Sequence, residues 1–87
     1  MKVLAIQQIQ REDDGLYYIR RFNAEAVIEL PAARVDTTPI LFSIEKGPLG
    51  TINIDVEITD SLNYPLLPVT KALKTMIRSL DSEGKLP

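Results

Sequence analysis

The sequence of 87 residues contains no cysteine and no histidine. The lack of cysteine excludes disulfides, thiolate metal ligands and a cysteine nucleophile. The lack of histidine removes the commonest general base and the commonest ligand of transition metals. We therefore predict that the protein is not an enzyme and that it has no catalytic, metal-binding or cofactor-binding residues.

Long apolar runs are also missing. The amino terminus has a short apolar run, Val3–Ile6, whereas a secretory leader needs about 7–15 apolar residues and a membrane span needs about 20. The formal net charge of −2 and the pI near 5.0 provide no bulk attraction to nucleic acid or to an anionic membrane. We expect a cytoplasmic protein that does not contact a membrane.

The composition predicts a single domain over residues 1–87. Hydrophobic residues make up 45% of the chain, which is enough for one core, and no repeat or linker interrupts it. Charge is spread evenly along the sequence, since residues 1–44 and residues 45–87 each carry five basic and six acidic side chains. No stretch of one charge sign therefore stands out.

Residues 40–59 predict a β-hairpin, because apolar and polar side chains alternate on both sides of the turn sequence Gly47–Gly50. The two apolar faces oppose each other only when the loop contains an odd number of residues. A three-residue loop would pair Ile44 with Ile52, and a five-residue loop would pair Ile44 with Ile54. The sequence leaves both registers open.

Three carboxylates fall on the polar face of this hairpin: Glu45, Asp55 and Glu57. Such a row could bind a cation or act as an acid–base pair. We interpret it as a solvated strand face whose charges discourage edge-to-edge aggregation. The reason is that no neighbouring group in the sequence pattern would shift the pKa of these carboxylates.

An earlier hairpin is predicted from strands at residues 2–10 and 16–22, which contain several β-branched and aromatic side chains. A three-residue loop over Asp13–Gly15, with the glycine in the left-handed conformation, gives the better register. The pairs that this register predicts are Ile9 opposite Ile19 and Ile6 opposite Phe22.

The segment from Asn23 to Leu30 is ambiguous. Its alternation favours a strand, either separate or continuing the preceding strand through a bend, whereas its alanines and glutamates would suit a short helix ended by Pro31. We prefer the strand. Residues 31–39 are predicted to be a connection, because the residue before a proline such as Pro39 is pushed towards extended geometry and away from a helix.

One helix is predicted near the carboxyl terminus, beginning at about Pro68, which suits a first helical turn. Apolar side chains recur there at spacings of three and four: Val69, Ala72, Leu73, Met76, Ile77 and Leu80. Gly84 is expected to end the helix, and Leu86 to fold back on it. Asp81 and Glu83 are unfavourably placed for the helix dipole, and the sequence does not explain them.

Together these elements predict an α+β domain. The expected architecture is an antiparallel sheet of four or five strands, made of two hairpins and a possible middle strand, followed by one C-terminal amphipathic helix packed on one sheet face. The order of strands and then a helix does not give the alternating units of a parallel nucleotide-binding sheet.

The function that we predict from these patterns is a small non-catalytic protein-interaction or oligomerisation module. Alternation gives the first hairpin apolar side chains on both faces, whereas one helix can cover only one face. A second copy of the chain, forming a homodimer, or another protein is a natural cover for the other face. The candidate contact residues are Val3, Ile9, Tyr17, Ile19 and Tyr64.

The alternative is a single-stranded nucleic-acid-binding module. Aromatic rings beside guanidinium groups are suited to stacking on bases and neutralising phosphates, and the predicted helix adds a basic face. The candidate residues are Tyr17, Tyr18, Arg20, Arg21, Phe22, Lys71, Lys74 and Arg78. The acidic pI counts against this alternative.

Overall fold

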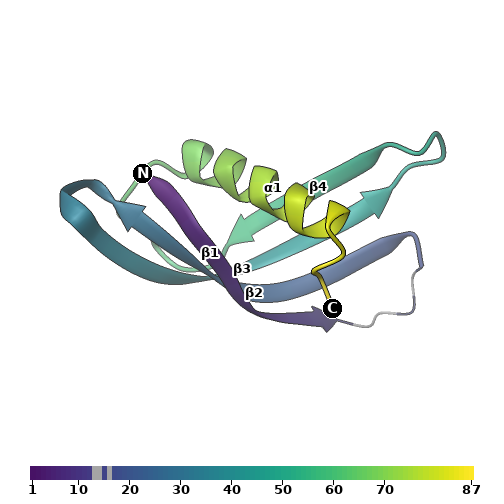
Figure 1. Ribbon diagram of the computed structural model, residues 1–87, viewed down its shortest axis with the longest axis horizontal. Helices are drawn as coiled ribbons and strands as arrows, with labels where there is room; N and C mark the ends of the chain where they lie inside the picture. Colours follow the sequence, from purple (N-terminus) through teal and green to yellow (C-terminus); the bar gives the residue numbers. More distant parts are fainter. Residues whose placement is uncertain (13–14, 16) are drawn as a thin grey trace.

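The computed structural model describes residues 1–12, 15 and 17–87. Its elements in chain order are β1 (Lys2–Glu12), β2 (Ile19–Leu30), the short 3₁₀ turn η1 (Pro31–Ala33), β3 (Arg34–Lys46), β4 (Ile52–Ile58) and α1 (Leu66–Ser82). The strands form one antiparallel sheet in the order β1-β2-β3-β4. In Figure 1, α1 runs along one face of this sheet, and the β2–β3 and β3–β4 hairpins project beyond its two ends. The predicted α+β fold is therefore confirmed.

The ambiguous segment Asn23–Leu30 is strand, and it continues β2 without interruption. The predicted connection over residues 31–39 is wrong for most of its length, because only Pro31–Ala33 turn and β3 begins at Arg34. Pro39 is tolerated in β3 because its missing N–H falls where the pairing with β4 ends. Its carbonyl still accepts a hydrogen bond from the Thr59 N–H, at 3.4 Å.

The β3–β4 hairpin has the five-residue loop, one of the two predicted possibilities. Ile44 pairs with Ile54, and Lys46 pairs with Ile52. The Gly47 N–H donates to the Thr51 carbonyl at 2.8 Å. Apolar side chains of β3 and β4 therefore share the face under α1, as the alternation predicts.

The register of the first hairpin differs from the prediction. Phe22 lies opposite Arg11 rather than Ile6, and Ile6 lies opposite Ala26. The strands end at Glu12 and begin again at Ile19, so the connection is longer than three residues. Of the loop Asp13–Gly15 that the sequence predicts, Asp13 and Asp14 lie outside the described residues.

Two irregularities in β1 explain this difference. The register with β2 shifts between Val3 and Ala5 and again between Gln7 and Gln10, and Gln8 has a φ of 53°. Each shift adds an unpaired residue and reverses which face the following side chains occupy. A simple alternation of faces along β1 therefore assigns several of its side chains to the wrong face.

As a result, Val3, Ile6 and Ile9 all pack on the side of the sheet that α1 covers, although they are spaced by three residues. Val3 is buried there, and Ile6 and Ile9 are partly buried against the same core. The prediction that the first hairpin has two apolar faces is therefore wrong. The bulges gather its aliphatic residues on one face.

The core lies between α1 and the covered face of the sheet. Phe22 and Phe42 stack there with ring centroids 4.8 Å apart. The helix contributes one buried stripe, Val69, Leu73 and Ile77. No helix in the described part of the chain is long and apolar enough to cross a membrane.

Both ends of α1 refine the prediction. The helix begins at Leu66, two residues before Pro68. At its other end Gly84 has a φ of 69°, the Gly84 N–H donates to the Asp81 carbonyl at 3.1 Å, and the Lys85 N–H donates to the Leu80 carbonyl at 2.9 Å. This pair of bonds is a Schellman motif, so the predicted glycine stop is confirmed.

The hydroxyl of Thr38 generates a prediction about stability. Thr38 is buried beside Ala26, and its Oγ1 is the one buried side-chain polar atom without a hydrogen-bond partner among the described residues. Because an unpaired buried hydroxyl is costly, Thr38→Val should raise the free energy of unfolding by about 1 kcal/mol. Urea titration with an unchanged m value would measure it.

The matched control is Thr37→Val, because Thr37 is the exposed neighbour on the other sheet face. This substitution should change the free energy of unfolding by less than about 0.5 kcal/mol. A loss of stability in Thr38→Val would show that the hydroxyl has a partner, contrary to the expectation.

Candidate protein-interaction face

The sheet face opposite α1, called the outer face below, is strongly acidic. The strand registers place on it six carboxylates, Glu12, Glu25, Glu29, Glu45, Asp55 and Glu57, and two cations, Lys2 and Arg21. The other eight cations of the sequence lie elsewhere, with four of the described carboxylates: Asp36, Asp60, Asp81 and Glu83. The charges that are even along the chain are thus separated in space.

The outer face is also hollowed in two adjoining places, of about 250 Å³ and about 470 Å³. Leu41 lines both hollows and is 39% exposed, so an apolar side chain lies between them. Together the hollows form an open depression across the middle of the sheet. An uncovered, concave and partly apolar sheet face can receive a side chain or an element of a partner.

The smaller hollow follows one row of the sheet. Pairing places Glu12, Arg21, Ser43 and Asp55 side by side across the four strands, and Glu57 lies next to Leu41 in the neighbouring row. Because antiparallel neighbours have side chains within about 5 Å of each other, these groups act together on anything that enters. The field at this hollow is set by carboxylates.

The larger hollow is lined by amides as well as charge. Gln8, Gln10 and Asn23 contribute to it, together with Glu25 and Thr59. Gln8 is the bulge residue with positive φ, a conformation that is unfavourable for a residue other than glycine. The bulge thus places an amide at the rim of the hollow, where it can donate to and accept from a partner backbone.

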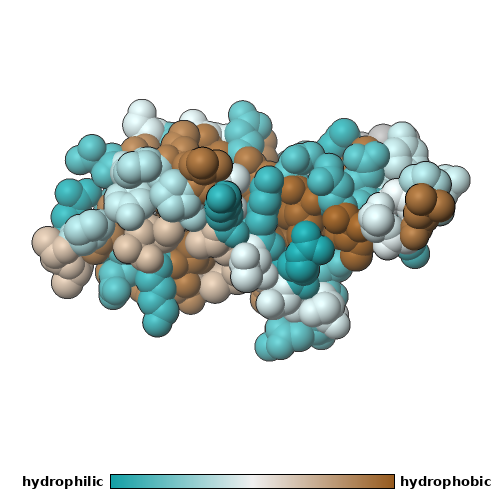
Figure 2. Space-filling model, turned by 90° about the horizontal axis from the view of Figure 1, so that it is seen from above, coloured by the Kyte–Doolittle hydropathy of each residue, from teal (hydrophilic) through white to brown (hydrophobic). Residues whose placement is uncertain are grey.

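The predicted interaction residues are not gathered on one surface. Val3 and Ile9 belong to the core side, Tyr64 packs partly against the core, and Ile19 is half-buried at the end of β2. Tyr17 is 94% exposed. It lies at the same end of the molecule as the β3–β4 hairpin, where Figure 2 shows apolar surface.

The predicted nucleic-acid residues are also divided between surfaces. Phe22 is buried against Phe42, and Arg21 is on the outer face whereas Arg20 is on the helix side. The remaining candidates are exposed or half-buried: Tyr17, Tyr18, Lys71, Lys74 and Arg78. The Tyr17 and Tyr18 rings contact each other edge to face at 6.0 Å. The strand and helix candidates therefore do not form one continuous surface.

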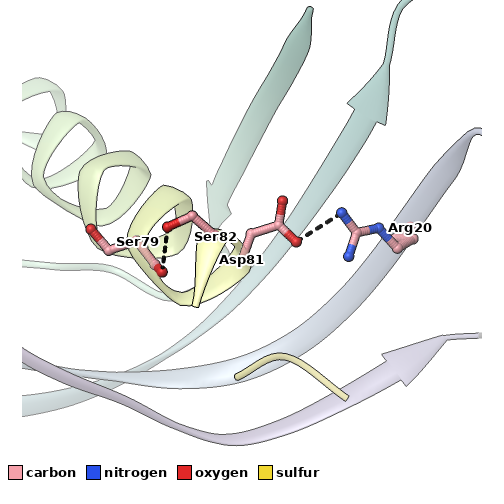
Figure 3. A network of polar contacts seen from close by, with 4 residues as sticks. All are labelled: Arg20, Ser79, Asp81 and Ser82. Carbon is pink, nitrogen blue, oxygen red and sulfur yellow. Dashed lines mark hydrogen bonds and ion pairs between the residues drawn. The ribbon is translucent and has the colours of Figure 1, made fainter. Parts of the chain in front are cut away.

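Arg20 has a structural role instead. Its guanidinium forms an ion pair with Asp81 at 2.9 Å, and this contact ties the last turns of α1 to β2 (Figure 3). In the same turn, the Ser82 hydroxyl donates to the Ser79 carbonyl at 3.0 Å. The ion pair explains why an aspartate is tolerated at the negative end of the helix dipole.

A double-mutant cycle with Arg20→Met and Asp81→Asn should give a coupling free energy of about 0.5–1 kcal/mol, because both side chains are partly screened from water. Urea unfolding of the four proteins would measure it. The matched control is the pair Lys85 and Glu83, which is longer, at 3.8 Å, and much more exposed. Its coupling should be close to zero, and equal coupling for the two pairs would contradict the expectation.

Among residues 1–12, 15 and 17–87, no group of three carboxylates is close enough together to hold a metal ion. The outer face was missed in the sequence because its carboxylates come from all four strands. Only Glu45, Asp55 and Glu57 of the second predicted hairpin were placed together. The signal that would have found the others is the alternation of Glu25 and Glu29 with buried residues in β2.

Comparison with known families gives one result. Residues 1–82 match the model of a protein family of unknown function, and the chain belongs to this family. No curated protein and no solved structure matches the chain.

Proposed function

We propose that this member of the family is a non-catalytic protein-interaction module that works through its outer sheet face. The observation that carries the proposal is the acidic, hollowed surface around Leu41, over which no described element of the chain is packed. A sheet with one covered face and one open face commonly uses the open face for contact or leaves it to water. The apolar side chain at the centre of the depression favours contact.

The chemistry of this face favours a protein partner with basic side chains. Six carboxylates repel the phosphates of nucleic acid, so nucleic acid would have to approach the helix side, where the aromatic and basic candidates are divided. A basic protein surface, in contrast, would gain from the field of the outer face and from burial of Leu41. The homodimer predicted through Val3 and Ile9 lacks support, because both residues pack on the core side of the fold.

Site-specific photo-crosslinking in the native cell tests the proposal. A photo-reactive residue replacing Leu41 should yield a discrete protein adduct, because position 41 lies at the centre of the proposed contact. The adduct should be lost when Asp55→Asn and Glu57→Gln are added, since these changes remove charge beside position 41. Mass spectrometry of the adduct measures the mass of the partner.

The matched control places the same reactive residue at Thr75, which is exposed on α1 and away from the outer face. If position 41 gives no adduct, or one that survives loss of both carboxylates, the outer face is not the working surface.

A further inference from the structure

We infer that the occupant of the outer face is the exposed side of α1 from a second copy of the same chain, so that copies associate head to tail. The inference rests on the proposed function and identifies the partner. Its basis is charge complementarity between two surfaces of one molecule. The outer face carries most of the described carboxylates, and α1 presents cations to solvent on the opposite side of the sheet.

The exposed side of α1 has the composition that the outer face requires. Lys71 and Arg78 are exposed and Lys74 is half-buried beside them, whereas the acidic residue of the helix, Asp81, is engaged with Arg20. Leu67, one turn before Lys71, is 69% exposed. The helix therefore offers an apolar side chain followed by cations, and the outer face offers Leu41 surrounded by carboxylates.

The dimensions of the two surfaces also agree. Lys71 and Arg78 are separated by about 10.5 Å along the helix axis. The row from Glu12 to Asp55 crosses three strand spacings, which is about 14 Å. A helix laid across the strands would thus bring both cations within side-chain reach of opposite ends of this row. The convex helix would also fill the concave part of the sheet.

The contact would be heterologous, since a helix surface of one copy meets a sheet surface of the next. The two surfaces lie on opposite sides of the molecule, so one copy can use both at once (Figure 1). Such association continues into a ring or an open chain rather than stopping at two copies. It should strengthen at low ionic strength, because exposed charges are screened by salt.

Complementation between two variants tests this arrangement. A face variant carries Asp55→Asn and Glu57→Gln, and a helix variant carries Lys71→Gln and Arg78→Gln. All four side chains are exposed, so both variants should fold. In sedimentation at low salt the wild-type chain should form species above its 9.7 kDa mass, and each variant alone should associate about tenfold more weakly.

An equal mixture of the two variants should restore association but stop at two chains, because only the intact helix of one can bind the intact face of the other. Controls with the same changes of charge elsewhere are Asp60→Asn with Glu83→Gln, and Arg11→Gln with Arg34→Gln. Both controls should associate as the wild-type chain does.

Three results would overturn the inference: a monomeric wild-type chain at high micromolar concentration and low salt, a mixture that stays monomeric, or variants that associate as strongly as the wild type. The crosslinking at position 41 separates this failure from failure of the proposed function. An adduct with a different protein would retain the outer face as an interaction surface and reject the second copy as its occupant.

Discussion

The continuous pairing of β2 with β3 is the constraint on which the rest of the structure depends. Twelve consecutive pairs run from Ile19 opposite Glu45 to Leu30 opposite Arg34 without a bulge. This unbroken ladder keeps one face apolar for α1 and the other polar along its whole length. β1 and β4 then add to a template whose faces are already defined, and the two stacked phenylalanines lie at its centre.

Regular alternation made much of the fold predictable. The β3–β4 hairpin, the stripe of α1 and the glycine stop follow from periodicity and turn chemistry, and the odd loop follows from matching apolar faces. β1 was not predictable by the same rule, because its bulges break the period of two. The spacing of Val3, Ile6 and Ile9 by three is the trace that they leave in the sequence.

The candidate site was harder to predict than the fold, because it depends on register between distant strands. Glu12, Glu25 and Asp55 are far apart in the chain and unremarkable singly. Alternation assigns each to a face of its own strand, but only the pairing shows that these faces coincide. An even distribution of charge along a sequence therefore does not exclude separation of charge in space, since a sheet sorts side chains by the parity of their positions.

The bulges in β1 also limit how the sheet can grow. A regular outer strand exposes a row of unpaired N–H and C=O groups that can capture another strand, and interruptions at Val3–Ala5 and Gln7–Gln10 spoil that row. The opposite border, β4, has only seven residues and carries Asp55 and Glu57 side by side, so a like strand would be repelled. Lateral extension into a fibril is thus blocked at both borders, and contact between molecules is directed to the broad surfaces of the domain.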